Sequence, residues 1–295
     1  MRLKVLGAAA GGGLPQWNCG CRNCADARSG RLPRMTQSSV AVSADGRDWV
    51  VLNASPDIRA QLTATPELWP RALRDSPIAA VICTNGDIDH LAGLLTLRES
   101  QRFDLWATGA GLGVIEGDRV FGVMNPDHVA RRRITLDQPF EPVPGLRVTA
   151  FAVPGKVALF LESDSPDPQR LGEETVGLRL QANGRTAYYI PGCAALPDWL
   201  VARLADGDLL LFDGTVWTDD EMATAGTGTK TGARMGHLAI SGPGGSLARL
   251  AALASRKVLI HVNNTNPVLR PDGPERAAIE AAGWTVAQDG LEITA

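Results

Sequence analysis

Short apolar segments rich in β-branched residues recur along the chain, and they constrain its fold more than any other feature. Gly, Pro, Asn or Asp bounds most of them, as is typical of strands. Apolar patterns of helical period lie between them, without internal repeats or a Pro-, Ser- or Gly-rich linker. The expected strands are 3–6, 38–42, 49–53, 79–83, 146–152, 157–162, 175–181, 186–191, 209–213 and 258–262, and the expected helices are 56–62, 90–98, 111–118, 197–204, 246–254 and 274–282. This order predicts two sheets with helices outside them, in one α/β domain over residues 1–295.

The composition is that of a soluble globular protein, with 44% hydrophobic and 21% charged residues. A net charge of −3 gives no electrostatic reason to expect nucleic acid or an anionic membrane as the main partner. No run approaches the ~20 apolar residues of a membrane span. The start, MRLKVLGAAAGGGLP, has too short an apolar part for a signal peptide, so we interpret it as a first strand and a glycine turn.

Three of the five cysteines are clustered in a loop of about residues 18–25. The C-x-C-x-x-C pattern is formed by Cys19, Cys21 and Cys24. Thiolates at this spacing can converge on one tetrahedral ion, so we expect a structural Zn²⁺, with three reduced thiols as the alternative. The fourth ligand is open between Asn264, His237 and another residue. Such clustering does not fit a disulfide framework and favours the reducing cytoplasm.

The stretch TNGDIDHLAGLL, residues 84–95, joins a carboxylate to an imidazole where an expected strand meets a helix. Asp89 and His90 lie at this junction, where side chains can reach an ion. His261 ends a late strand, a position that commonly lines a cleft, although this position taken alone fits a hydrogen-bonded core histidine better.

The remaining histidines are less informative. His237 follows the small, polar segment 223–236, which we expect to be the least ordered part, either a surface loop or a mobile cover. An acid/base role for His237 and simple exposure at a helix start are both open. His128 lies in a polar turn and receives no role.

Four blocks of sequence together resemble one known family. They are MRLKVLGAAAGGGLPQWNCGC, TNGDIDHLAGLL, LLFDGTVW (Leu210–Trp217) and MGHLAISG (Met235–Gly242). The family is that of coenzyme PQQ synthesis protein B, within the metallo-β-lactamase superfamily, and the likeness covers essentially the whole chain. The resemblance implies an αββα four-layer sandwich with its metal site at the sheet edges, and a structural zinc at the cysteines.

The chain departs from the dinuclear pattern of this superfamily in an orderly way. Asn85 and Asp87 stand where the first metal has two histidines, and the later turn 153–156 offers no third. Gly192 stands at the position of the bridging aspartate. The positions of the second metal's ligands are kept: Asp89, His90 and His261. The resemblance therefore implies one mononuclear site.

Two imidazoles and one carboxylate fit either Fe(II) with open positions for O₂ or a mononuclear Zn²⁺ that activates water. Hydrolysis of phosphodiesters typically uses two ions, so the lost bridge favours oxygen chemistry. The resemblance implies a role in the biosynthesis of pyrroloquinoline quinone (PQQ), by iron-dependent hydroxylation of the tyrosine ring in a Glu-Tyr-derived precursor. The alternatives are a mononuclear metallohydrolase and a non-catalytic carrier or export factor for PQQ or an intermediate.

Further residues are expected near this substrate. His237, Asp87 and Asn85 are the candidates for catalytic contacts, and Arg234 and Lys230 are candidates for binding its carboxylates. Other proteins of the PQQ pathway are candidate partners, and a homodimer is a candidate assembly.

Overall fold

Two seven-stranded sheets form the centre of the computed structural model, which describes residues 1–162, 167 and 169–295. In spatial order, the first sheet contains β14 (Glu292–Thr294), β1 (Arg2–Gly7), β2 (Ser39–Ser43), β3 (Trp49–Leu52), β4 (Ile78–Ile82), β5 (Phe103–Thr108) and β6 (Val129–Ile134). The second contains β13 (Trp284–Val286), β12 (Arg256–Ile260), β11 (Leu209–Asp213), β10 (Arg185–Ile190), β9 (Val176–Ala182), β8 (Leu146–Ala152) and β7 (Pro139–Val143).

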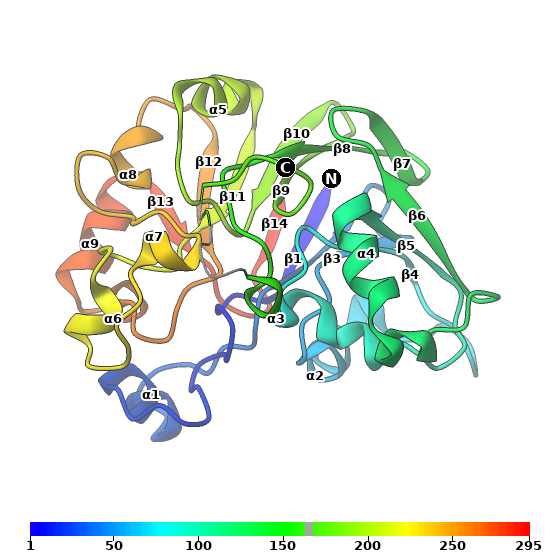
Figure 1. Ribbon diagram of the computed structural model, residues 1–295, viewed down its shortest axis with the longest axis horizontal. Coiled ribbons are helices and arrows are strands. Elements are labelled where there is room, and N and C mark those ends of the chain that lie inside the picture. Colours follow the sequence, from blue (N-terminus) through cyan, green and yellow to red (C-terminus); the bar gives the residue numbers. More distant parts are fainter. Residues whose placement is uncertain (163–166, 168) are drawn as a thin grey trace.

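Helices cover the outer faces of both sheets. The α-helices are α1 (Arg22–Arg28), α2 (Ile58–Ala64), α3 (Ile88–Leu91), α4 (Gly109–Gly117), α5 (Asp198–Arg203), α6 (Glu221–Thr224), α7 (Gly232–Met235), α8 (Ser246–Arg249) and α9 (Pro274–Ala281). Short 3-10 helices lie at Pro66–Leu68, Ala92–Leu95, Arg119–Val123, Leu159–Leu161, Leu204–Asp206 and Pro267–Leu269. In Figure 1, α2 and α4 lie outside the first sheet, and α8 and α9 lie on the opposite side of the molecule. The expected αββα sandwich is confirmed.

Strand β3 shows how the sequence produces these layers. Successive side chains of a strand point to opposite faces of its sheet. Val50 and Leu52 accordingly belong to the core between the two sheets. Trp49 and Val51 belong to the core that the first sheet makes with α2, where Ile58 is fully buried. A strand buried on both faces is a continuous apolar run, as Trp49–Leu52 is.

Parallel strands of both sheets end at the same edge of the sandwich. In the first sheet β3 to β6 are parallel, and in the second β10 to β13 are parallel. Single bridges join the sheets there: Ala9 pairs with Val262, and Asn85 pairs with Thr175. The carboxyl ends of parallel strands are where ligands bind in α/β proteins. The two sheets therefore present such ends side by side.

The structure confirms most expected strands to within two residues at each end, but the strand at 157–162 is wrong. Leu159–Leu161 is a 3-10 helix with exposed side chains. In the described ranges no strand pairs with its backbone, and the N–H of Leu159 donates to Oδ1 of Asp87 at 3.2 Å.

Three further expectations differ from the structure. The helix expected at 246–254 ends at Arg249, and the segment 223–236, expected to be the least ordered, contains the end of α6 and the whole of α7. The sequence patterns do not predict strands β5, β6, β7, β13 and β14. The edge strand β6 has the sequence VARRRI, whose three arginines are typical of a charged loop. In the structure its apolar end residues, Val129 and Ile134, are buried. No helix in the described part of the chain is long and apolar enough to cross a bilayer.

Candidate metal centre

Three candidate metal ligands from both sheets converge at the shared edge. Asp89 and His90 lie in α3, which follows β4, and His261 follows β12 directly. Oδ2 of Asp89 lies 3.1 Å from Nε2 of His261 and 3.9 Å from Nε2 of His90. Figure 1 shows α3 between the two halves of the molecule. His261 has a φ of 59°, a left-handed conformation that is uncommon outside glycine, so tertiary contacts hold it there.

Hydrogen bonds at Nδ1, on the side of the ring away from Asp89, orient the imidazoles of His90 and His261. Nδ1 of His90 lies 2.7 Å from Oδ1 of Asn85, and Nδ1 of His261 lies 2.8 Å from Oγ1 of Thr215. The Asn85 oxygen only accepts, so His90 carries its proton on Nδ1 and leaves the Nε2 lone pair free. Nε2 of His90 is buried without a hydrogen-bond partner in the described structure. A buried lone pair next to a carboxylate and a second imidazole fits a metal ion.

The electrostatics of the three groups also suit a cation. Burial alone would raise the pKa of Asp89, but His90 and His261 reverse this and hold it below its ordinary value. Burial lowers the pKa of His90, which keeps this imidazole neutral and able to act as a ligand. Burial would also lower the pKa of His261, but the carboxylate of Asp89 raises it above its ordinary value. The negative charge of Asp89 thus favours a positive charge at this point, whether a proton or a metal ion.

A second group behind the site was not expected from the sequence. Asp213, the last residue of β11, accepts at Oδ2 from Nδ1 of His237, at 2.7 Å, and from the N–H of Cys193. Its Oδ1 accepts from the hydroxyl of Thr215 at 2.6 Å, and the same hydroxyl faces Nδ1 of His261. Asp213, His237 and His261 are also close enough to hold an ion together. The Asp213 oxygens are already filled by these donors, however, so we interpret the group as a hydrogen-bonded relay.

A signal for this relay was present in the sequence. Asp213 ends the expected strand 209–213, and Thr215 follows within the block LLFDGTVW. That strand is parallel to and paired with the one that leads to His261. Polar residues at the ends of neighbouring parallel strands meet at one edge, which only the strand order could show.

A cavity of about 270 Å³ opens in front of the triad. Asn85, Asp87 and His237 line it, together with the cations Lys156, Lys230 and Arg234 and the carboxylate of Glu162.

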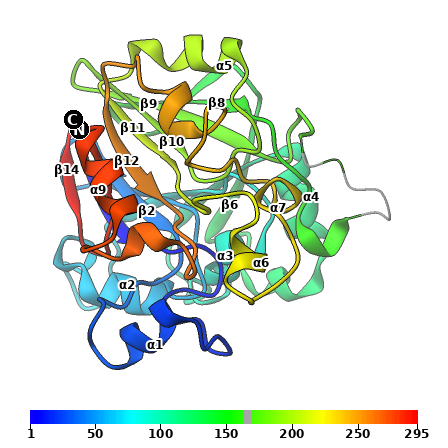
Figure 2. The same ribbon diagram turned by 90° about the vertical axis from the view of Figure 1, so that its left-hand side faces the viewer.

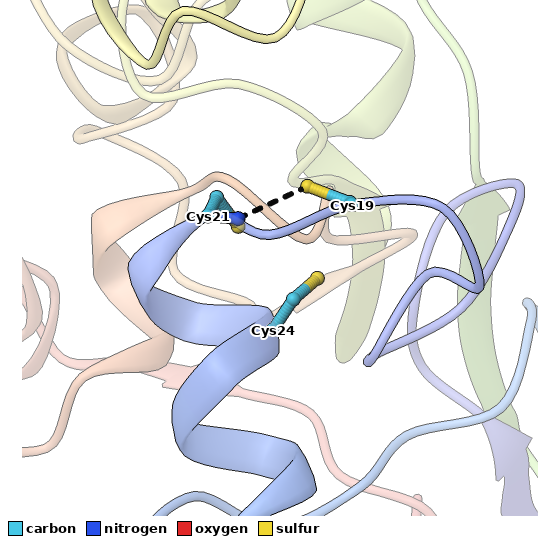
Figure 3. A group of neighbouring side chains, drawn as sticks. All are labelled: Cys19, Cys21 and Cys24. Carbon is cyan, nitrogen blue, oxygen red and sulfur yellow. Dashed lines mark hydrogen bonds between the residues drawn. The ribbon is translucent and has the colours of Figure 1, made fainter.

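The three clustered cysteines form a separate candidate metal site (Figure 3). Cys19 lies in the loop before α1, Cys21 caps this helix and Cys24 lies in its first turn, so the turn brings the sulfurs together. The side-chain nitrogen Nδ2 of Asn264 donates to the sulfurs of Cys19 and Cys24, both at 3.2 Å, and to that of Cys21 at 3.6 Å. Of the candidates for the fourth zinc ligand, Asn264 lies at this cluster. The alternative prediction of His237 as that ligand is wrong, because His237 lies in the relay with Asp213.

Comparisons with known proteins agree with this geometry. The model of the β-lactamase superfamily domain matches residues 48–262. Coenzyme PQQ synthesis protein B of Ruegeria pomeroyi is 60% identical over 293 residues, which cover 99% of each chain. The protein of the same name from Methylobacterium sp. is 56% identical and covers all of both chains. The chain belongs to the coenzyme PQQ synthesis protein B family.

Solved structures place this family member among metallo-β-lactamase folds. Zn²⁺-bound PqqB from Methylobacterium extorquens is 55% identical and matches all of both chains with a TM-score of 0.99. A diphosphatase of the PhnP family is 22% identical and has a TM-score of 0.69 over 99% of this chain and 97% of its own, which shows a shared fold.

In this PqqB-family chain, the residues expected near the substrate have specific neighbours. Asn85 orients His90 and lines the cavity. Asp87 lies 3.5 Å from Nζ of Lys156, and Arg234 makes two hydrogen bonds to Glu162, at 3.1 and 2.7 Å.

Two other expected positions are also located. Lys230 lines the cavity and is exposed. Gly192 lies beside His237, since a Cβ built on it would be 3.5 Å from Cε1 of that ring.

The two remaining cysteines, Cys83 and Cys193, are buried, as expected for small core residues.

Proposed function

We propose that this chain acts in PQQ biosynthesis by binding one Fe(II) ion at Asp89, His90 and His261 and hydroxylating the tyrosine ring of a Glu-Tyr-derived precursor. Membership of the family named for PQQ synthesis supports the pathway. The observation that carries the chemistry is the buried Nε2 of His90, which has no hydrogen-bond partner among the described residues and lies close to the other two groups of a two-histidine, one-carboxylate set. That set is typical of mononuclear iron oxygenases.

The proposed reaction needs O₂ and a two-electron reductant. Fe(II) with open coordination positions supplies O₂ chemistry. One oxygen atom replaces a ring hydrogen as hydroxyl. The other leaves as water, which takes up two electrons from the external reductant and two protons.

The protein's own residues orient the site and move the proton. Asn85 and Thr215 fix the imidazoles of His90 and His261. Asp213 accepts from Nδ1 of His237, so the Nε2 atom of this cavity-lining ring is left to exchange a proton with the phenol of the substrate. Proton removal from the phenol activates the ring toward oxygen.

The cysteine cluster has a different role in this proposal. Cys19, Cys21 and Cys24 would hold a structural Zn²⁺, with the side-chain oxygen of Asn264 as the fourth ligand once its amide group turns over. A site filled by protein ligands has no open position, which fits a structural role. The relative described as Zn²⁺-bound supports zinc in this fold. Clustered thiols without a disulfide support our proposal of a cytoplasmic location.

The test is anaerobic loading with Fe(II), followed by isotopically labelled O₂, ascorbate and a Glu-Tyr peptide. We expect one labelled oxygen atom in the tyrosine ring, detected by mass spectrometry. His90→Ala and His261→Ala should lose both active-site iron and product, whereas the matched variant His128→Ala should keep both. Full iron occupancy without a ring-oxygenated product would refute hydroxylation, and full iron binding by His90→Ala would refute the ligand assignment.

A mononuclear zinc hydrolase is a second candidate, because the similar structure from Methylobacterium extorquens is described as Zn²⁺-bound. Metal analysis after purification without chelator separates the two. Iron at the triad and zinc only at the cysteines supports the oxygenase. Peptide cleavage by protein with zinc at both sites supports the hydrolase.

A further inference from the structure

An uninterrupted chain of charged side chains borders the cavity. Asp87, Lys156, Glu162 and Arg234 alternate in sign along it. Lys156 is at its centre: its Nζ lies 3.5 Å from Oδ1 of Asp87 and 3.7 Å from Oε1 of Glu162. Only 12% of the Lys156 side chain is exposed, so this ammonium group is held inside the cavity wall.

Lys156 has donor capacity that its neighbours do not use. An ammonium group has three N–H donors. In the described structure its one hydrogen bond goes to the carbonyl of Val157, at 3.2 Å, and both carboxylates lie beyond hydrogen-bond distance. Arg234 differs, because its guanidinium is already fixed on Glu162 by two hydrogen bonds, at 3.1 and 2.7 Å. Among the described residues, Lys156 makes no hydrogen bond to either neighbouring carboxylate, so its ammonium group can donate to a carboxylate of a ligand.

The position of Lys156 is fixed by packing. A Cβ built on Gly236, just before His237, would lie 3.1 Å from Cγ of Lys156 and 3.3 Å from its Cδ. The aliphatic stem thus lies against a glycine next to the relay, with the ammonium group in the same cavity as Asp89 and His261. A ligand held by Lys156 is therefore held in front of the proposed metal.

The charge of the cavity favours an acidic ligand. Among the described residues, its lining has three carboxylates (Asp87, Asp89, Glu162) and three cations (Lys156, Lys230, Arg234), so these charges cancel. A divalent ion at the triad adds two positive charges to this balance, which these described residues leave unneutralised. The volume, about 270 Å³, suits one small molecule.

We infer that Lys156 binds a carboxylate of the substrate, and that this cavity selects small acids with at least two carboxylates. Asp87 and Glu162 hold the ammonium group in place, and Arg234 braces Glu162. The inference rests on the proposed function for the identity of the substrate, and it assigns the carboxylate contact to Lys156 rather than to Arg234 or Lys230.

Calorimetric titration of the zinc-loaded protein with glutamyl-tyrosine tests this without oxygen or turnover. We expect Lys156→Met to raise Kd by about tenfold or more, the loss typical of a charge-assisted hydrogen bond. Lys230→Met, the same change at an exposed position of the same cavity, should raise Kd by less than about threefold. Equal losses in both variants, or none in Lys156→Met, would overturn the inference.

A second measurement needs no variant. Glutaminyl-tyrosine and glutamyl-tyrosinamide each lack one carboxylate, so we expect the wild-type protein to bind both more weakly than glutamyl-tyrosine, and the one that lacks the Lys156 contact about tenfold more weakly. Lys156→Met should not weaken binding of that analogue further. Equal binding of all three peptides contradicts the inference. Lys156-dependent binding without ring oxygenation by the iron-loaded protein would instead refute only the proposed function.

Discussion

Thr215 connects His261 of the triad to Asp213, and through it to His237, by one hydroxyl group. Its Oγ1 lies 2.8 Å from Nδ1 of His261 and 2.6 Å from Oδ1 of Asp213, which in turn holds His237. A hydroxyl can accept from His261 and donate to Asp213 at the same time. This places the Nδ1 proton of His261 and leaves its Nε2 lone pair for an ion.

Replacing this hydroxyl should weaken metal binding. We expect Thr215→Val to weaken binding of Zn²⁺ or Co²⁺ at the triad about 10- to 100-fold, as is typical when a partner behind a metal ligand is lost. Thr215→Ser keeps the hydroxyl and should bind metal nearly as the wild type does. Competition with a chelator of known affinity measures both. Equal affinity of the valine and wild-type proteins would show that Thr215 does not orient His261.

At the scale of elements, the site depends on how closely α3 approaches the end of β3. The N–H of Ala54 donates to the carbonyl of His90 at 2.8 Å, and the N–H of Gly93 donates to that of Ala54 at 2.9 Å. A Cβ on Gly93 would lie 2.2 Å from the carbonyl oxygen of Ser55. Only glycine permits this contact, which fixes the segment that bears two candidate ligands.

Gly93→Ala should therefore push α3 away from β3. We expect it to lower the free energy of unfolding by about 1–3 kcal/mol, the usual cost of overpacking, and to weaken metal binding. Gly113→Ala is the matched control, because Gly113 lies in α4 with no atom near its Cβ position. The control should gain about 0.5–1 kcal/mol. Denaturant unfolding of both variants tests this, and an unchanged Gly93→Ala protein would contradict it.

Helix α6 contains a buried acid that should make stability depend on pH. Burial raises the pKa of Glu221 to about 7 from an ordinary 4.5, despite hydrogen bonds from Thr265 and the N–H of Trp217. The folded protein therefore binds more protons than the unfolded chain between these values. The free energy of unfolding falls as pH rises from about 4.5 to 7, by at most about 1.4 kcal/mol per pH unit.

Glu221→Gln should remove this dependence, because glutamine has no proton to lose. We expect the variant to be more stable than the wild type at pH 8 and to have no advantage at pH 4.5. Urea unfolding across this range measures the difference. Glu99→Gln, at an exposed position, is the control and should follow the wild type. Parallel curves for wild type and Glu221→Gln would rule out the buried charge as the cause.

At the scale of the whole molecule, the N-terminal part of the chain contacts its C-terminal part in two places. Strands β1 and β14 pair, so the two chain ends lie side by side in Figure 1. The cysteine cluster joins the loop before α1 to Asn264, which follows His261 by three residues. Figure 2 shows α1 at the opposite end of the molecule from α5. The expected homodimer and association with other pathway proteins stay predictions.

Loss of the proposed structural zinc should destabilise the contact between the N-terminal loop and the segment that contains Asn264. We expect Cys24→Ser to lose one zinc per chain and to lower Tm, since metal binding by the native state stabilises it. Cys83→Ala also removes a buried thiol, but away from the cluster, and should keep its zinc. Metal analysis and calorimetry compare the two. A Cys24→Ser protein with full zinc content would refute the assignment.

Much of the fold and part of the site could be predicted from the sequence. Buried strands such as 146–152 and 209–213 are continuous apolar runs with turn residues around them, and both were located to the residue. Edge strands such as β6 and β14 are short or charged and lack this signal. The segment Leu159–Leu161 has the signal, but no strand among the described residues pairs with it, and the N–H of Leu159 donates to Asp87 instead.

The sequence by itself determined the types and order of the candidate ligands, and the absence of the histidines that a first metal would need. Asp89, His90 and His261 were predicted together because the resemblance related positions that spacing alone cannot relate. Tertiary structure alone decided that Asp213 and Thr215 stand behind the histidines and that Lys156 lies among carboxylates in the cavity. The physical reason is that periodicity and turn chemistry act between near neighbours, whereas these contacts depend on which strand ends meet when two sheets pack.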